Sequence, residues 1–200
     1  MNTKTLLLVF LISIPPLTIS AQEVDSLHVE EGMFSLKDFF SEDSLLTSRT
    51  DFYFQQLTDK QRVGQMMMNA AGRLGWPTPM INELVKGGEL GGVLLLNGSR
   101  EGFKKMATSF QSISVQEGHL PLVFSADAEP SLVNKKIQGT ARVSATSGIQ
   151  TVEESREVAN MIAEELTYIG IQYNLAPVLD LSPENAAIGN RSFGYEPDSV

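Results

Sequence analysis

The amino-acid sequence predicts an α/β fold, the first part of a (β/α)8 TIM-type barrel that is incomplete in this chain. Short, wholly apolar runs predict strands that are buried on both faces. Amphipathic helical patterns separate these runs, and this alternation is typical of a parallel sheet covered by helices. We count four such units in the 200 residues, whereas a closed barrel of this type has eight.

The N-terminus has the pattern of a secretory signal peptide over residues 1–21. Lys4 precedes an apolar run from Leu6 to Ile14, and small residues lead up to Ala21. The run is about half as long as a bilayer requires, so we expect cleavage of this segment and no membrane span. The sequence therefore predicts a periplasmic or secreted protein.

Residues 22–50 read as an acidic leader without sustained periodicity, and we expect the folded domain to occupy residues 51–200. The chain has a formal net charge of -9 and no cysteine. The negative charge argues against nucleic acid as a partner, because phosphates attract basic surfaces. Without cysteine we expect neither disulfide bonds nor the lipid anchor of a bacterial lipoprotein.

The first two β units are expected directly after the leader. Thr58 and Gln61 have the spacing of a capping box, which predicts a short helix that leads into a strand at Gln65–Asn69. A helix over Ile81–Lys86 then ends at a pair of glycines. The apolar run Gly91–Asn97 predicts the second strand.

The next two units follow the same alternation. Apolar side chains at three- and four-residue spacing predict a helix over Arg100–Gln116, followed by a buried strand at Pro121–Asp127. A second capping box begins at Thr151 and opens a helix that Gly170 ends, and a strand at Tyr173–Asp180 follows. The sequence stops at a pattern typical of a helix start. We therefore expect a fragment of a longer protein rather than an open doubly wound sheet.

Polar residues at the carboxyl ends of the predicted strands are the candidate functional residues, because parallel α/β folds bind ligands there. These residues are Asn97, Asp127 and Asp180, and the loop Ile188–Gly194 follows the fourth strand. A carboxylate in such a position can cap a helix or accept hydrogen bonds from hydroxyl groups. Position alone does not separate the two roles.

The segment around the fourth strand resembles a known family. Asn174–Asp180 reads Asn-Leu-Ala-Pro-Val-Leu-Asp, and Ile188–Gly194 follows eight residues later and precedes Glu196-Pro197. These motifs closely resemble glycoside hydrolase family 3, and the resemblance extends over Leu57–Val200. It implies the N-terminal barrel of that family and a carbohydrate substrate.

The Ile-Gly-Asn-Arg-Ser form of the second motif is similar to the β-N-acetylglucosaminidase branch of the family. The resemblance implies a β-N-acetylhexosaminidase that acts on terminal β-linked N-acetylhexosamine in cell-wall or other glycans, with no cofactor and no metal. It also implies that Asp127 and Arg191 hold hydroxyl groups of the substrate. For Asp180 we expect the structural role of tying the loop after its strand, and we leave it out of the binding set. A carboxylate accepts from hydroxyls, and a guanidinium donates to the sugar and can hold the carboxylate beside it.

Two features depart from the family's pattern. The family usually has Gln-Glu-Gly-Gly after the strand-end aspartate, whereas this chain has Ala128-Glu129-Pro130-Ser131. Proline fixes φ and removes a donor where glycine is free. The histidine loop and the later aspartate that serve catalysis in the family do not occur in these 200 residues. We therefore name no catalytic residue, expect the catalytic groups beyond residue 200, and expect His28 and His119 at the surface.

The altered loop leaves a second function open, a non-catalytic barrel of the same family that binds glycans or packs against a partner domain. A domain fused after the barrel fits either function. An open-sheet nucleotide-binding protein ranks lower, because no glycine-rich phosphate loop follows the first predicted strand.

Overall fold

The computed structural model describes residues 40–181 and 183–199, so the predicted signal peptide and most of the predicted leader lie outside the described residues. Helix α3 (Ser44–Gln56) crosses the expected boundary at residue 50. The Asp43 carboxylate accepts hydrogen bonds from the amides of Leu45 and Leu46, at 2.8 and 3.0 Å, and thus caps the first turn. Sequence periodicity did not predict this helix, because all of its residues are exposed.

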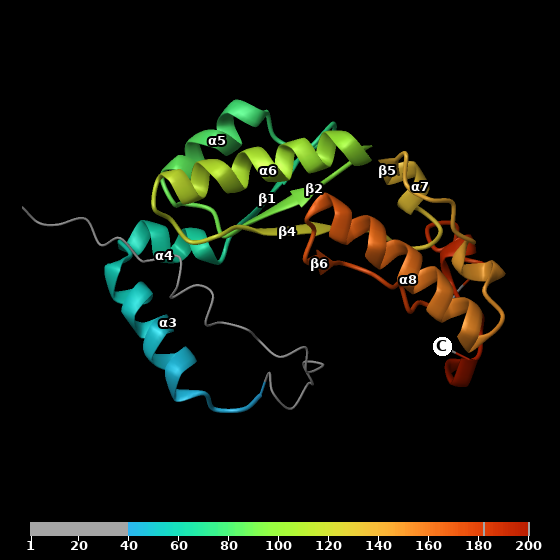
Figure 1. Cartoon of the computed structure of the whole chain (residues 1–200). Helices are drawn as coiled ribbons and strands as arrows, with labels where there is room; N and C mark the ends of the chain where they lie inside the picture. The colour runs from blue at the N-terminus through green and yellow to red at the C-terminus, as the bar shows by residue number, and fades with distance from the viewer. Residues whose placement is uncertain (1–39, 182, 200) are drawn as a thin grey trace, which may run out of the picture. The chain divides into compact units, whose positions relative to one another are not determined.

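Four parallel strands form the main sheet, in the order β1-β2-β4-β6 (Figure 1). They are β1 (Met68–Ala71), β2 (Gly92–Leu95), β4 (Val123–Ala126) and β6 (Tyr173–Asn174). The helices that precede or connect these strands are α4 (Asp59–Gln65), α5 (Thr78–Lys86), α6 (Arg100–Gln116), α7 (Val133–Lys136) and α8 (Val152–Ile169). A two-stranded sheet pairs β3 (Gly98–Ser99) with β5 (Ile137–Gln138), and short 3-10 turns are η1 (Thr146–Gly148), η2 (Gly189–Arg191) and η3 (Pro197–Ser199).

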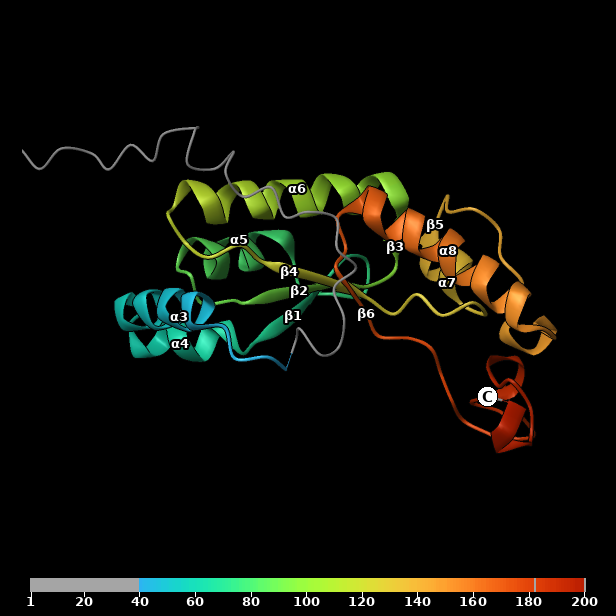
Figure 2. The same ribbon diagram turned by 60° about the horizontal axis from the view of Figure 1, so that its bottom comes forward.

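The strand order is that of a barrel rather than of a doubly wound sheet. Each strand of the main sheet pairs with the strand of the next β unit, and the progression never reverses. A doubly wound sheet would instead place later strands on the other side of the first one. Helices α5 and α6 lie on the same side of the sheet (Figure 2), as right-handed connections that proceed in one direction require. The prediction of an incomplete barrel is confirmed.

The core lies between the sheet and the helices α5, α6 and α8. Phe103 and Phe110 of α6 are 1% and 0% exposed, and Phe124 of β4 is 2% exposed. They share one apolar cluster with side chains of α5 and α8. Burial of a phenylalanine contributes about 1.5–3 kcal/mol relative to exposure, so α6 is anchored firmly on the sheet.

The opposite face of the sheet is apolar and partly exposed. Side chains of a strand alternate between the two faces, and Met68, Val123 and Tyr173 on this face are 38%, 44% and 54% exposed. The corresponding face of a complete barrel lines its interior. The sheet therefore carries its helices on the side that is the outside of a barrel.

The predicted helix caps are present. Thr58 Oγ1 accepts from the Gln61 amide at 3.3 Å, and the Gln61 side chain accepts from the Thr58 amide at 3.1 Å. Thr151 and Glu154 form the equivalent pair at the start of α8, at 3.1 and 3.2 Å. Gly170 ends α8 with a φ of 91°, which glycine adopts without strain. Helix α6 has the predicted bounds.

Strands β2 and β4 are shorter than the predicted runs Gly91–Asn97 and Pro121–Asp127, and the other two strands differ more. β1 begins at Met68 rather than at Gln65, because helix α4 continues to Gln65. β6 is two residues long and does not reach Asp180. The Leu175 amide still donates to a carbonyl of β4, but Pro177 has no amide hydrogen with which to continue the ladder.

Candidate functional site

The candidate site lies where the chain leaves β4 at the carboxyl end of the sheet. Ala126 is the last residue of this strand, so Asp127 is the first residue beyond it. The side-chain amide of Asn174, on the neighbouring strand, accepts from the Ala128 amide at 3.0 Å and donates to the Ala128 carbonyl at 3.3 Å. The sheet therefore fixes the backbone on both sides of Asp127.

Asp127 forms an ion pair with Lys136. Lys136 is the last residue of α7, a single turn in the loop after β4. The side chains of Asp127 and Lys136 are 29% and 21% exposed, so solvent reaches the pair. An accessible carboxylate beside an ammonium group offers both acceptors and donors to hydroxyl groups. Sequence reasoning missed Lys136, because its short polar segment has no periodicity that would place it.

Arg191 contacts Glu129 rather than Asp127. The Arg191 Nε lies 2.8 and 3.1 Å from the two carboxylate oxygens of Glu129. The Glu129 side chain is fully buried, while that of Arg191 is 27% exposed. Burial of a carboxylate is costly without a cation, and Arg191 supplies one. The idea that the guanidinium holds a carboxylate beside it is therefore right for Glu129 and wrong for Asp127.

This pairing leaves the outer edge of the Arg191 guanidinium available. Nη1 donates one hydrogen bond to the Ala187 carbonyl at 3.0 Å, and Nε is used by Glu129. A guanidinium has five N–H groups. Among the described residues, no acceptor is present for the other N–H groups of Arg191. Oxygen atoms of a ligand can accept hydrogen bonds from them.

The two ion pairs are anchored in the same loop. Asp127 and Glu129 are separated by one residue, and so short a stretch of backbone spans at most about 7 Å. Lys136 and Arg191 therefore bind to neighbouring points of one loop. The site combines an accessible carboxylate with two cations that solvent reaches. Such a set of acceptors and donors suits a ligand rich in hydroxyl groups.

Pro130 occupies a position that suits proline. The Leu132 amide donates to the Glu129 carbonyl at 3.1 Å, which makes Glu129–Leu132 a β-turn with Pro130 as its second residue. Proline is favoured there, because its φ is already set and the turn needs no donor from this residue. The altered loop is therefore an ordered turn that keeps Glu129 in place.

The other sequence-based candidates have structural roles. Asn97 has a φ of 56°, and its carbonyl accepts from the Arg73 amide at 2.9 Å, so it turns the chain after β2. Asp180 is tied as expected, although through its backbone carbonyl, which accepts from Ser192 Oγ at 2.6 Å. His119 lies at the amino end of the sheet, with Nε2 2.7 Å from a carbonyl oxygen at the end of α5. The other histidine lies outside the described residues.

An apolar groove of about 420 Å³ runs along α8, near the charged groups but separate from them. Val158 and Ile162 line it together with Pro130 and Phe193, and no charged side chain lines it. Its polar lining consists of neutral side chains, Ser155, Thr167, Gln172 and Asn174, and hydrogen bonds from neutral groups hold a sugar less strongly than those from charged groups. We therefore place the site at the strand ends. Across the described ranges, no group of three His, Cys, Asp or Glu side chains is arranged to hold a metal ion.

Comparison with known proteins assigns the chain to a family. Residues 58–200 match the sequence profile described as "Glycosyl hydrolase family 3 N terminal domain". The chain belongs to glycosyl hydrolase family 3. The matched range contains the main sheet and both ion pairs of the site. The resemblance inferred from the motifs around the fourth strand is confirmed.

Curated relatives of this family 3 chain are named β-hexosaminidases. The enzyme of Neisseria gonorrhoeae is 31% identical over 122 residues, which are 56% of this chain and 34% of that protein. The β-hexosaminidase LpqI of Mycobacterium tuberculosis is 32% identical over 117 residues, which are 56% of this chain and 30% of that protein. The chain thus spans about a third of the length of the curated relatives it matches.

Solved structures support the barrel-type fold of the family 3 domain. A glycoside hydrolase family 3 β-N-acetylglucosaminidase from a Paenibacillus species has a TM-score of 0.62 and 29% identity, over 72% of this chain and 28% of that chain. The β-glucoside phosphorylase BglX has a TM-score of 0.66 and 16% identity, over 80% of this chain and 29% of that chain. At this lower identity the second likeness concerns the fold alone.

Proposed function

We propose that the chain is the first, substrate-binding part of a β-N-acetylhexosaminidase, a glycosidase that removes terminal β-linked N-acetylhexosamine from cell-wall or other glycans. The proposal rests on two ion pairs at the carboxyl end of the sheet, Asp127 with Lys136 and Glu129 with Arg191. The names of the curated relatives and of the Paenibacillus structure support the choice of sugar.

In this proposal the terminal sugar is held by groups of both kinds. The Asp127 carboxylate accepts hydrogen bonds from neighbouring hydroxyls, and the Lys136 ammonium beside it donates to ring oxygens or hydroxyls. Arg191 donates from the N–H groups that Glu129 and Ala187 leave free. The buried Glu129 does not reach the sugar itself.

The acidic groups of this site are suited to binding rather than to bond cleavage. A retaining glycosidase needs a nucleophilic carboxylate and an acid/base group about 5–5.5 Å apart across the scissile bond. Asp127 and Glu129 are each engaged by a cation, and Glu129 is fully buried. We therefore assign neither to catalysis and place the catalytic residues beyond residue 200.

Hydrolysis assays of the full-length protein test the proposal. We expect release of the aryl group from an aryl β-N-acetylglucosaminide, and strongly reduced release by Asp127→Asn. Titration with N-acetylglucosamine separates the alternative, a non-catalytic glycan-binding barrel, which binds the sugar without hydrolysing the aryl substrate. The Glu129–Leu132 turn that contains Pro130 is compatible with both functions. Absence of both binding and hydrolysis contradicts both.

We also propose that the protein is exported to the periplasm or secreted. The support is the signal-peptide pattern of residues 1–21. No helix in the described part of the chain is long and apolar enough to cross a bilayer. N-terminal sequencing of the mature protein checks this proposal. We expect an N-terminus close to Ala21, and a mature protein that keeps Met1 contradicts it.

A further inference from the structure

The turn that carries Arg191 is fastened to the loop after β4 at two points. The first point is the ion pair of Arg191 with the buried Glu129. The second is one residue earlier, where Ser131 Oγ lies 2.6 Å from the carbonyl oxygen of Asn190. A carbonyl oxygen only accepts, so the Ser131 hydroxyl donates this hydrogen bond. One contact holds the side chain of Arg191 and the other holds its backbone.

Ser131 is itself held in place by a third segment. Its Oγ accepts a hydrogen bond from the Thr146 amide at 2.9 Å and lies 3.1 Å from Thr146 Oγ1. Thr146 is 2% exposed. The Glu129–Leu132 turn, which contains Ser131, is closed by its own backbone hydrogen bond. The hydroxyl therefore joins three chain segments at a single, well-defined position.

We propose that Glu129 and Ser131 are positioning residues for substrate binding, because together they set the direction in which Arg191 presents its free N–H groups. Glu129 engages Nε and the Ala187 carbonyl engages Nη1, so the remaining N–H groups are left for a ligand. Ser131 fixes the backbone from which the side chain extends. The inference rests on the proposed function, since it assumes that Arg191 binds the sugar.

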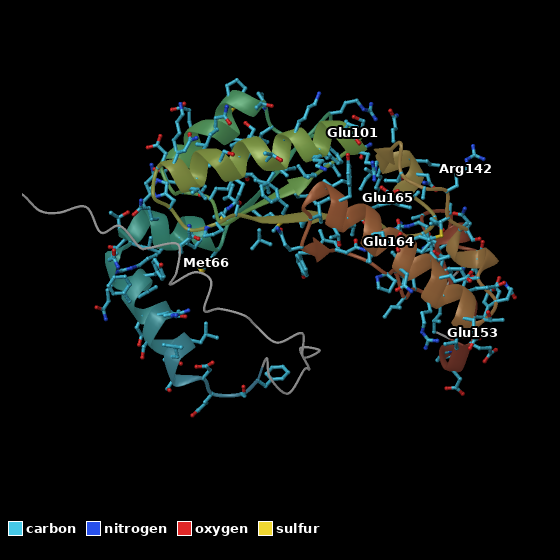
Figure 3. The ribbon with its side chains drawn as sticks, viewed as in Figure 1. Met66, Glu101, Arg142, Glu153, Glu164 and Glu165 are labelled. Atoms are coloured by element: carbon cyan, nitrogen blue, oxygen red, sulfur yellow. The ribbon has the colours of Figure 1, made fainter. Side chains whose placement is uncertain are left out.

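The chain offers matched pairs of groups that lie away from this site. Arg100 of α6 donates from Nε to Glu165 of α8, and the two side chains are 28% and 14% exposed. Figure 3 shows Glu165 on α8 close to the end of α6 that carries Glu101. The hydrogen bond with Glu165 raises the pKa of Arg100. Ser114 Oγ donates to the Leu120 carbonyl at 2.8 Å and is buried at the amino end of the sheet.

These groups supply the control variants. Glu165→Gln weakens a partly buried arginine–carboxylate pair, as Glu129→Gln does, but at the interface of α6 and α8. Ser114→Ala removes a buried hydroxyl that donates to a carbonyl, as Ser131→Ala does. Any effect that follows from general loss of stability appears in the controls as well.

Limited digestion of the full-length protein with trypsin tests whether Glu129 and Ser131 hold Arg191 in place, and it requires no activity measurement. Trypsin cleaves after Arg191 only when the guanidinium leaves Glu129 and enters the specificity pocket of the protease. The exposed Arg142, labelled in Figure 3, serves as the internal reference site. Relative to cleavage after Arg142, we expect cleavage after Arg191 to become about tenfold faster in Glu129→Gln and Ser131→Ala, the factor for loss of one hydrogen bond near the upper end of the usual range. The control variants should match the wild type.

Steady-state kinetics test whether the contacts of Glu129 and Ser131 with the Arg191 turn serve substrate binding. With an aryl β-N-acetylglucosaminide we expect KM to rise about tenfold in Glu129→Gln and Ser131→Ala while kcat changes little, as for lost ground-state binding. In an Arg191→Lys background, Ser131→Ala should not raise KM further. The variants Glu165→Gln and Ser114→Ala should keep the wild-type KM.

The outcomes separate the two proposals. The inference is overturned if trypsin cleaves after Arg191 in Ser131→Ala no faster than in the wild type. This test holds even if Glu129→Gln fails to fold. If the enzyme is active and cleavage after Arg191 is faster while KM is unchanged, Glu129 and Ser131 hold Arg191 without a role in substrate binding. This result also overturns the inference. A wild-type protein that hydrolyses no aryl glycoside refutes the proposed function. In that case N-acetylglucosamine binding tests the positioning role. Loss of binding in Ser131→Ala, with binding kept in Ser114→Ala, supports the role. Equal binding by the two variants contradicts it.

Discussion

Replacement of Arg191 by alanine tests how far the buried carboxylate of Glu129 depends on its cation. The Glu129 side chain is 0% exposed, and Arg191 is its only ion-pair partner among the described residues. Removal of one partner of a buried ion pair costs about 3–5 kcal/mol, because the other charge is left uncompensated. We expect Arg191→Ala to lower the free energy of unfolding of the full-length protein by this amount.

A second substitution distinguishes the buried charge from a simple loss of contacts. In the double variant Arg191→Ala/Glu129→Gln the buried group is a neutral amide, so at least half of the lost stability should return. Urea denaturation followed by circular dichroism measures both variants. Lys86→Ala serves as a control, because the side chains of Lys86 and its partner Glu83 are 50% and 75% exposed and such a pair contributes at most about 1 kcal/mol. A double variant as unstable as Arg191→Ala alone would refute this reasoning.

Three further predictions concern the site and the fold. Asp127→Asn should lower kcat/KM about a hundredfold through lost hydrogen bonds to the sugar. Its effect on the free energy of unfolding should stay below that of Arg191→Ala, because the side chains of Asp127 and Lys136 are 29% and 21% exposed, whereas Glu129 is fully buried. A loss of stability as large as that of Arg191→Ala contradicts this. Phe110→Ala should cost about 3–5 kcal/mol of stability in denaturation experiments, whereas the 58% exposed Val115 tolerates alanine. Residues 22–200 alone should lack a cooperative thermal transition, because one apolar sheet face is uncovered, and a sharp calorimetric peak would argue otherwise.

The positions of α4, α6 and α8 could be predicted from the sequence because their signals are local. The capping box that begins at Thr151 and the left-handed Gly170 lie within the helix that they delimit. The same holds for the capping box of α4. Strand ends depend instead on neighbouring strands. β6 pairs with β4 for two residues only, and Pro177 is the one local signal within Tyr173–Asp180 that the ladder stops early.

The candidate site could be located but not assembled from the sequence. Strand-end position and motif identified Asp127 and Arg191, and both lie in ion pairs at the carboxyl end of the sheet. Their partners were not predicted, because Arg191 and Glu129 are 62 residues apart and a charged residue is rarely expected to be buried. One signal was present: Glu129 is retained in a loop whose other residues depart from the family's pattern. A charged residue kept between altered neighbours indicates a partner in the fold.

The most direct test of the account compares two substrates with the same leaving group. The full-length protein is assayed with an aryl β-N-acetylglucosaminide and with the matching aryl β-glucoside, for the wild type and for Arg191→Lys. We predict that the wild type hydrolyses the N-acetylglucosaminide with the higher kcat/KM, and that Arg191→Lys loses about tenfold of this value. Hydrolysis of the glucoside alone, or wild-type kinetics in Arg191→Lys, would contradict the assignment of this chain as the binding part of a β-N-acetylhexosaminidase.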